Sequence, residues 1–350
     1  QMCVVPVGRR SRMGLVVEIA DETGIDPLRL KDVVAVIDQV TPVDRHWLDF
    51  TQFASDYYQH PWGEVALPAL PPILRTLPGP RFTQALARLR KREIACPSAA
   101  TSLHCLTAQQ QAAVEALLTA QGFGVHLLFG ITGSGKTEVY LRAIEDRLQR
   151  DERAQVLMLV PEINLTPQLE SLLRARFGAA GVVVLHSGLP DGERSAAWLA
   201  AHEGRARIVV GTRLAVFASM PGLALIVVDE EHDPSYKAGE GVRYSARDLA
   251  IKRAQMLGVP VVLGSATPSL ETWAAAQGGR YTLLRLTQRA VDEDAEPPVI
   301  EVVDLRSPAA AAGAGIAAPA AAALKAAHAA GAQALVFLNR RGYAPVVACD

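Results

Sequence analysis

The run Gly130-Ile131-Thr132-Gly133-Ser134-Gly135-Lys136-Thr137 decides the fold of this chain, because it fits the phosphate-binding pattern G-x-x-x-x-G-K-[ST]. It follows the strand-like residues 125–129 and precedes the helix-like residues 138–149. Its glycines let successive backbone N–H groups point at phosphate oxygens, and the helix adds a favourable dipole. A plain glycine-rich turn is the alternative, and the complete match in this context disfavours it. We expect Lys136 to reach the β- and γ-phosphates and Thr137 to hold Mg²⁺. The rest of the predicted nucleotide cradle is Gly130, Thr132, Gly133, Ser134 and Gly135.

A second motif, Asp229-Glu230-Glu231-His232, follows the apolar run 225–228. An acid at the end of a buried strand is well placed to hold Mg²⁺ opposite a phosphate loop. The sequence therefore predicts Asp229 as the metal carboxylate and Glu230 as the general base, with His232 in the same catalytic group. Alone, such a cluster is usually a solvated loop. Downstream of a phosphate loop, the catalytic interpretation is favoured, and a simple nucleotide kinase is disfavoured.

A third motif, Gly264-Ser265-Ala266-Thr267-Pro268, ends another apolar run. Small hydroxyl residues at a strand end can sense whether the phosphate is present. An ordinary strand-to-loop turn is the alternative, and the motif gains weight only from its place after the other two.

Short apolar runs alternate with helical segments from Leu106 onward, which is typical of a parallel sheet covered on both faces. The expected strands are residues 125–129, 156–160, 182–185, 208–210, 225–228 and 261–263. The fold class is therefore α/β. We predict an ATP-binding domain over residues 106–298 and the start of a second α/β unit over residues 299–350.

The first 105 residues have a different pattern. Residues 1–74 read as a small strand-rich domain, with strands expected at 4–7, 15–19 and 33–40 and a helix within 44–60. Residues 75–105 form a linker. Within it, residues 82–94 have helical spacing and carry a basic face, which is more often a solvated surface than a DNA phosphate contact.

Bulk composition bounds the remaining possibilities. The net charge is -1, so no global basic field indicates nucleic acid. Cys3, Cys96, Cys105 and Cys349 form no C-x-x-C pair, which favours reduced thiols in the cytoplasm over a disulfide framework or a complete metal site. No signal peptide is visible. The alanine-rich residues 308–334 predict a surface helix near 317–330 and not a membrane span. Both ends of the chain look cut, so we expect a fragment.

The order GITGSGKT, DEEH and SAT resembles that of superfamily 2 helicases, and longer strings resemble the PriA family of bacterial replication-restart helicases. They are GITGSGKTEVYL (130–141), LVPEINLTPQL (159–169), HSGL (186–189), GTRLAVF (211–217), DEEHDPSYK (229–237), RYSARDLA (243–250), GSATPSLET (264–272) and FLNRRGYAP (337–345). The resemblance covers nearly the whole chain from residue 106. It implies a P-loop, RecA-like helicase lobe behind a small β-rich DNA-binding domain.

The resemblance also implies roles for individual residues. Gln110 would read adenine with its amide, and Pro161-Glu162 and Thr212-Arg213 would line the DNA track. A loop that couples DNA contact to ATP turnover would contain Tyr236, Lys237, Arg243, Tyr244 and Arg247. The family has a tryptophan where this chain has Val242, which weakens that aromatic platform.

The ends of the chain resemble parts of the same family. Residues 1–74 are similar to the later part of a domain that binds the 3' end of a nascent strand, with Lys31 as a phosphate-seeking cation, and the winged helix that follows it in the family is largely missing. Cys349 matches the first zinc cysteine. One thiolate cannot build a tetrahedral site, so we expect Zn²⁺ only in a longer chain. Most of the second motor lobe, which supplies an arginine finger, is also absent, and Arg340 and Arg341 belong to its first strand and loop.

Three functions follow as expectations. The first is an ATP-dependent 3'-to-5' DNA helicase that recognises stalled forks and starts primosome assembly. Its cofactors would be ATP and Mg²⁺, and its partners would be forked and single-stranded DNA, primosome proteins and single-strand DNA-binding protein, at the bacterial nucleoid and not at a membrane. The second is an ATP- and DNA-binding module without turnover. The third, a small-molecule kinase, is disfavoured by DEEH and SAT.

Overall fold

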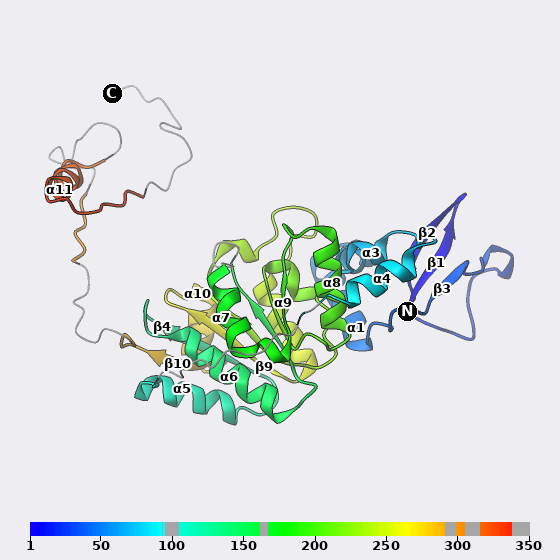
Figure 1. Ribbon diagram of the computed structural model, residues 1–350, viewed down its shortest axis with the longest axis horizontal. Coiled ribbons are helices and arrows are strands. Elements are labelled where there is room, and N and C mark those ends of the chain that lie inside the picture. Colours follow the sequence, from blue (N-terminus) through cyan, green and yellow to red (C-terminus); the bar gives the residue numbers. More distant parts are fainter. Residues whose placement is uncertain (93, 95–104, 162–166, 291–298, 305–315, 338–350) are drawn as a thin grey trace, which may run out of the picture. The chain divides into compact units, whose positions relative to one another are not determined.

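The computed structural model describes residues 1–92, 94, 105–161, 167–290, 299–304 and 316–337 (Figure 1). Residues 1–293 form one compact unit and residues 294–350 a second. In the second unit, the described residues contain the helix α11 (Ala318–Ala329), whose side chains are all at least partly exposed. The predicted alanine-rich surface helix is thereby confirmed. Among the described residues, no helix has the length and apolar character that crossing a membrane requires.

The core of the first unit is a parallel sheet of seven strands in the order β10-β4-β9-β8-β5-β7-β6. The strands are β4 (Gly124–Gly130), β5 (Gln155–Leu159), β6 (Val182–Leu185), β7 (Ile208–Gly211), β8 (Leu223–Val228), β9 (Pro260–Ser265) and β10 (Thr282–Leu286). The expected α/β class and six of these strands are confirmed. The seventh, β10, was not predicted, because Thr282 and Arg285 interrupt its apolar residues.

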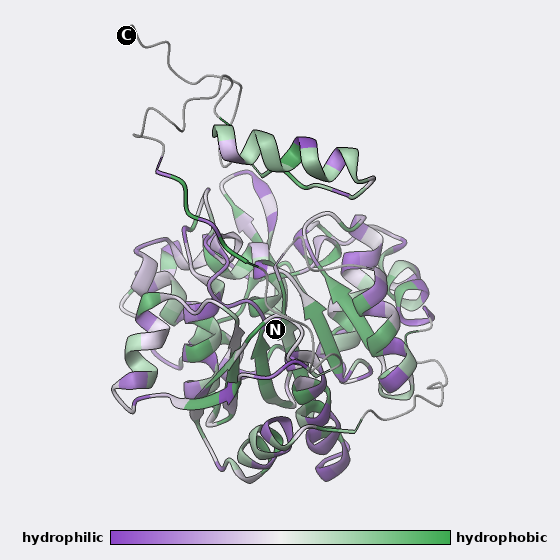
Figure 2. Ribbon diagram, turned by 90° about the vertical axis from the view of Figure 1, so that its left-hand side faces the viewer, coloured by the Kyte–Doolittle hydropathy of each residue, from purple (hydrophilic) through white to green (hydrophobic). Residues whose placement is uncertain are grey.

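Helices cover both faces of this sheet, as Figure 2 shows for the apolar strands between two helical layers. Successive residues of β5 illustrate the division: Val156 and Met158 lie in one hydrophobic cluster, whereas Leu157 and Leu159 lie in the other. The first cluster contains residues of α5 (Ala108–Thr119), α6 (Lys136–Arg150) and α7 (Pro167–Phe177). The second contains residues of α8 (Asp191–His202), the 3-10 turn η4 (Arg213–Phe217), α9 (Ala246–Leu257) and α10 (Leu270–Gln277). Burial on both faces explains why the strands are continuous apolar runs.

The N-terminal residues form an antiparallel sheet in the order β2-β1-β3, made of β1 (Met2–Val7), β2 (Arg10–Leu15) and β3 (Ala35–Ile37). The predicted second strand at residues 15–19 was wrong in register. The turn lies at Gly8, which has φ +60°, so the polar residues that follow pair with β1 and the β-branched run after Leu15 does not. Cross-strand hydrogen bonding to β1 outweighs local β propensity here.

Four helices connect this sheet to the seven-stranded core: α1 (Arg45–Tyr58), α2 (Trp62–Ala69), α3 (Pro72–Arg75) and α4 (Phe82–Arg90). α1 packs on α9, and both α3 and α4 pack on α8. The Trp47 indole donates to the carbonyl of Phe217 at 2.7 Å, and Arg253 donates to the carbonyls of Val216 and Ala218 at 2.7 Å each. On the basic face of α4, Arg90 forms an ion pair with Glu203 at 2.7 Å. The guanidinium group of Arg90 therefore contacts the protein and is not simply solvated. The boundaries at residues 74 and 105 stay a prediction.

Candidate nucleotide and nucleic-acid site

The phosphate loop lies between the end of β4 and the start of α6, as the sequence predicts. Gly133 and Gly135 have φ values of +79° and +76°, a region that side-chain-bearing residues rarely adopt. The segment after β10 supports the loop from outside, because Ala290 donates its backbone N–H to the carbonyl of Gly133 at 2.9 Å. Ile131 in turn donates to the carbonyl of Leu286 at 3.2 Å. The unpredicted strand β10 therefore braces the loop.

Gln110 makes a contact that its predicted role did not include. Its side-chain oxygen accepts from the backbone of Thr107 at 2.8 Å, which completes a capping box at the start of α5. Its amide nitrogen donates to the carbonyl of Ser134 in the phosphate loop at 2.9 Å, and the residue is buried. A Cβ on Gly135 would lie 2.2 Å from that nitrogen, so the close approach requires glycine. Gln110 thus ties α5 to the phosphate loop, and its reading of adenine stays a proposal.

Lys136 faces the acidic motif. Its Nζ lies 3.5 Å from Oε1 of Glu230 and 3.2 Å from the carbonyl oxygen of Gly130. The side chain is 11% exposed and that of Glu230 27%, so this pair is shielded from much of the solvent screening that weakens surface ion pairs. The ammonium of the loop and the predicted general base therefore lie together, at the edge of the sheet where the parallel strands end.

Asp229, next to Glu230 in the acidic motif, is half-buried and contacts two tyrosines. The hydroxyl of Tyr140, from α6, donates to Asp229 Oδ1 at 3.0 Å, and the hydroxyl of Tyr236 donates to the Asp229 carbonyl at 2.6 Å. Burial and the charge of Glu230 raise the pKa of Asp229, whereas the Tyr140 hydrogen bond and Lys136 oppose that rise. A Cβ on Gly264 would lie 1.5 Å from the Tyr140 hydroxyl. The glycine of the third motif is therefore what leaves room for this tyrosine.

Glu230 has a left-handed backbone, with φ +44°. Such a conformation in a residue other than glycine costs free energy and is found where surrounding contacts enforce it, often at functional sites. His232 lies beside it, with Nδ1 3.6 Å from Glu230 Oε2 and 2.7 Å from the hydroxyl of Ser265. Thr267 Oγ1 lies 3.3 Å from the other ring nitrogen of His232. The second and third motifs therefore meet through this histidine.

Glu231, which the sequence did not single out, anchors the acidic motif. Its side chain has no exposed surface and accepts hydrogen bonds from the backbone of Ser269 at 2.7 Å and from the hydroxyl of Thr272 at 2.9 Å. Arg247 Nη1 donates to the same carboxylate at 3.0 Å. Arg247 was predicted to contact DNA; the structure places it in this network, and its contact with DNA stays a prediction. No signal in the motif spacing identifies Glu231, because its partners lie on α9 and at the start of α10.

The residues present fit Mg²⁺. Magnesium prefers oxygen ligands, keeps several waters and is usually held by one or two carboxylates together with substrate phosphates. The carboxylate of Asp229 and the hydroxyl of Thr137, which adjoin Glu230 and Lys136, supply such oxygens. Within the described part of the chain, no group of three or more histidine, cysteine, aspartate or glutamate side chains could hold a metal by itself. Asp229 and Thr137 would therefore provide two of the oxygen ligands of such an ion.

The residues predicted to touch DNA have different surroundings. Tyr236 is buried, so its ring is not available to stack on a base, and burial with the charge of Asp229 raises its pKa well above the ordinary value. Tyr244 is half-buried against Phe217, with the ring centroids 5.0 Å apart. Lys237 and Arg243 are exposed. Val242 packs against the hydrophobic core.

Two further residues that were predicted to line the DNA track, Thr212 and Arg213, lie directly after β7. The backbone of Thr212 donates to the carbonyl of Leu185 at 3.2 Å, and Thr212 is buried. Arg213 Nη1 donates to the carbonyl of Ser235 at 3.2 Å and joins this turn to the loop after the acidic motif. Lys31 is exposed and lies on the N-terminal region. The predicted residues Glu162, Arg340, Arg341 and Cys349 lie outside the described residues.

Comparisons with known proteins agree with this geometry. The family of DEAD/DEAH box helicases matches residues 107–275, and the PriA 3'DNA-binding domain (3'BD) matches residues 1–71. The replication restart protein PriA of Haemophilus influenzae is 46% identical over 70% of this chain and 32% of its own length. PriA of Bacillus subtilis is 44% identical over 70% of this chain and 30% of its own length. PriA of Treponema pallidum is 33% identical over 99% of this chain and 50% of its own length.

Solved helicases align more distantly. The DEAD-box helicase Mss116 bound to ssRNA and UDP-BeF is 18% identical, with a TM-score of 0.40 over 60% of this chain and 43% of its own. The chain spans about a third to a half of the length of the curated relatives it matches. With a helicase domain, a 3' DNA-binding domain and these relatives, the chain belongs to the PriA family of replication restart proteins.

Proposed function

We propose that the protein is an ATP-driven DNA helicase motor that works in replication restart. The observation that carries the proposal is the 3.5 Å approach of Lys136 Nζ to Glu230 Oε1 beside the half-buried Asp229. Phosphoryl transfer depends on positioning and electrostatic stabilisation, and this arrangement supplies a cation for the phosphates and a carboxylate for the attacking water.

Each side chain has a defined task in this proposal. The backbone N–H groups of the loop, residues 130–137, cradle the phosphates, and Lys136 binds the β- and γ-phosphates. Glu230 accepts a proton from the water, and its unusual backbone conformation directs its carboxylate toward Lys136. His232 connects Glu230 to Ser265, so that a change at the phosphate reaches the third motif. Mg²⁺, held by Thr137 and Asp229, would neutralise charge on the phosphates.

The proposed DNA contacts are those that membership of the PriA family implies. We propose that the N-terminal residues bind the 3' end of a nascent strand with help from Lys31, and that Lys237 and Arg243 contact single-stranded DNA. Movement from 3' to 5', recognition of stalled forks, assembly with primosome proteins and contact with single-strand DNA-binding protein extend the same proposal. The relatives are replication restart proteins, which supports replication restart as the process.

A test compares ATP hydrolysis by the purified chain with and without forked DNA. Hydrolysis that forked DNA stimulates and that Lys136→Ala abolishes supports the motor. If the native chain binds a fluorescent ATP analogue and DNA but shows no hydrolysis under either condition, the second candidate holds.

That second candidate is a nucleotide- and DNA-binding module without turnover of its own. An arginine supplied to the γ-phosphate from another domain contributes about 10³–10⁵ in rate in related phosphate-loop enzymes. A binding module of this kind would show nucleotide affinity without turnover.

A further inference from the structure

A cavity of about 210 Å³ lies between the N-terminal helices and the core of the first unit. One wall is the α2–α3 connection, from Pro68 to Arg75. The opposite wall combines Leu185, at the end of β6, with Trp198 of α8 and Leu214 of η4. Pockets for drug-sized ligands are about 300–1,000 Å³, so the occupant of this cavity is a smaller group.

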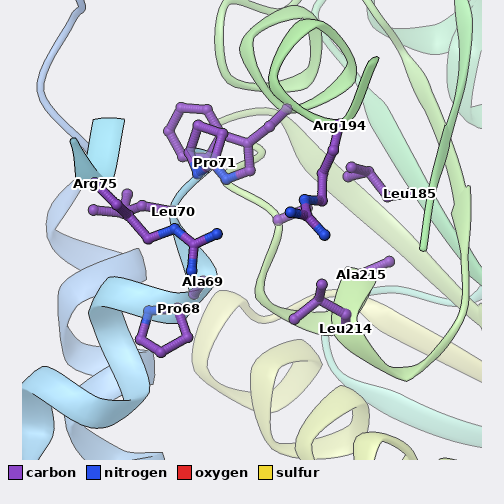
Figure 3. Close-up of a pocket in the computed structure, with 11 residues that line it drawn as sticks. Pro68, Ala69, Leu70, Pro71, Arg75, Leu185, Arg194, Leu214 and Ala215 are labelled. Atoms are coloured by element: carbon purple, nitrogen blue, oxygen red, sulfur yellow. The ribbon is translucent and has the colours of Figure 1, made fainter. Parts of the chain in front are cut away.

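The cavity wall is apolar apart from two guanidinium groups. Arg75, from α3, and Arg194, from α8, project into the space between the two walls (Figure 3). Arg194 is fixed by Asp191 at 2.6 Å and by the carbonyl of Ser187 at 3.4 Å. Arg75 is exposed, and its guanidinium has no hydrogen-bond or ion-pair partner among the described residues. The two cations therefore flank an apolar space, which suits a planar apolar group attached to an anion. A nucleotide of single-stranded nucleic acid has this combination, because its flat base is joined to a phosphate on either side.

The position of the cavity favours the same occupant. Leu185 and Leu214 immediately adjoin the segments 186–189 and 211–213, at the carboxyl ends of β6 and β7, where ligands of open α/β sheets bind. A second cavity of about 220 Å³ shares Pro68, Ala69 and Leu214 and reaches Val242 and Tyr244. The apolar surface therefore continues toward the loop that carries the exposed cations Lys237 and Arg243.

We propose that this cavity receives one unstacked base of single-stranded DNA, while Arg75 and Arg194 bind the phosphates on either side of it. The inference rests on the proposed function for its DNA ligand but adds a contact between α3 and the motor core. Stacking on apolar and aromatic side chains combined with cations is how proteins hold single strands without reading sequence. The N-terminal helices would then bind the same DNA strand as the motor.

The test measures binding of a fluorescent 20-nucleotide thymidine oligomer by the full chain. Arg75→Ala should weaken binding several-fold and reduce the slope of log affinity against log salt by about 0.7, the value for one lost phosphate contact on a single strand. Arg88→Ala is the matched control, because Arg88 is an exposed arginine on α4 outside the cavity lining, and its affinity and slope should match the native chain.

A second variant tests the base itself. Leu214→Trp should fill the cavity and weaken binding of the thymidine oligomer by about tenfold, within the range measured for stacking of one base. Its affinity for an oligomer of the same length without bases should equal that of the native chain, because no base then needs the cavity. Circular dichroism and thermal melting confirm that each variant is folded.

The outcomes separate the two proposals. If Arg75→Ala and Leu214→Trp are folded and bind the thymidine oligomer as the native chain does, the base pocket is wrong, whatever else binds there. If the native chain binds no oligomer at all, the DNA-motor proposal fails as well. If the native chain binds DNA and shows DNA-stimulated hydrolysis while both variants bind as it does, only the base-pocket proposal is overturned.

Discussion

Arg247 Nη1 donates to Glu231 Oε2 at 3.0 Å, and no part of the Glu231 side chain is exposed. Asp248 and the same Glu231 raise the pKa of Arg247, although burial acts in the opposite direction and is the largest single effect. This pair joins α9, which follows the loop 237–245, to the acidic motif. Through the hydrogen bonds of Glu231 to Ser269 and Thr272, it also fixes the segment after the third motif.

The first prediction concerns that pair. Arg247→Ala leaves a buried carboxylate without its cation, so we expect the free energy of unfolding to fall by about 3 kcal/mol. Urea denaturation at pH 7 measures it. Arg243→Ala is the control, because Arg243 is exposed, and its effect should stay within about 0.5 kcal/mol. Equal stability of the two variants would show that the Arg247–Glu231 contact contributes nothing to the fold.

Lys136→Ala should remove nucleotide binding and leave the fold intact. Within the described residues, its ammonium contacts the Gly130 carbonyl and the Glu230 carboxylate alone, so its loss exposes no large apolar surface. Titration with a fluorescent ATP analogue gives the affinity, and a thermal melt gives the stability. Lys91→Ala, an exposed lysine after α4, should retain native affinity. Unchanged affinity in Lys136→Ala would remove the phosphate-loop assignment.

A third prediction follows from Asp229. Burial and the charge of Glu230 raise the pKa of Asp229 above its ordinary value of 3.8. The folded chain therefore binds the proton of this carboxyl group more tightly than the unfolded chain does. The stability from this group is therefore fully present below pH 3.8 and is lost as the pH rises through the folded pKa. At pH 7 the native chain carries a half-buried charge at Asp229 that the variant Asp229→Asn lacks.

We expect Asp229→Asn to melt at a higher temperature than the native chain at pH 7, with the difference shrinking as the pH falls through the folded pKa of Asp229. Hydrolysis should be lost at the same time, because the amide cannot hold Mg²⁺ as a carboxylate does. Asp233→Asn, at a half-buried position of the same loop whose side chain caps the turn at Pro234–Tyr236, should show no such pH-dependent difference. If Asp229→Asn melted below the native chain across the whole pH range, the direction of the predicted stability change would be wrong.

The fourth prediction concerns Gln110. Its side chain completes the capping box of α5 and holds the carbonyl of Ser134, so Gln110→Ala removes two hydrogen bonds of a buried amide. We expect about 1–2 kcal/mol of lost stability and weaker binding of both ATP and ADP. Gln111→Ala is the matched control, because that exposed amide bonds only to Glu115 on the same helix. A variant that loses adenine selectivity but no stability would favour direct reading of the base over the tie to the loop.

The sequence predicted the motifs because their chemistry requires fixed residues at fixed spacing. A phosphate loop needs Gly133 and Gly135 for positive φ, and an acid must follow a buried strand to meet it. Glu231 and the Ser134 contact of Gln110 could not be predicted in this way. They depend on side chains that meet only after β9 lies beside β8 and α5 packs on α6. The burial of Tyr236 could not be predicted for the same reason, since its hydroxyl is held by the backbone carbonyl of Asp229.

The last prediction tests contact between the N-terminal helices and the loop 237–245. The backbone N–H of Ser245 donates to the hydroxyl of Tyr58, on α1, at 3.0 Å, and Lys237 Nζ lies 5.5 Å from the centre of the same ring. Tyr58→Phe keeps the ring beneath Lys237 but leaves the Ser245 N–H without this acceptor. A lost hydrogen bond of this kind costs about 1 kcal/mol. We therefore expect a small loss of stability and a lower ratio of DNA-stimulated to basal ATP hydrolysis, since the start of α9 is less firmly held.

Tyr57→Phe is the control, because Tyr57 is 67% exposed and its ring contacts survive the substitution. Both variants keep an aromatic ring in α1, so a difference between them isolates the Ser245 hydrogen bond. If the stimulation ratio of Tyr58→Phe equals that of Tyr57→Phe, α1 is a passive support for the loop. A lower ratio with unchanged basal hydrolysis would show that the N-terminal helices influence how strongly DNA contact is transmitted to the ATP site.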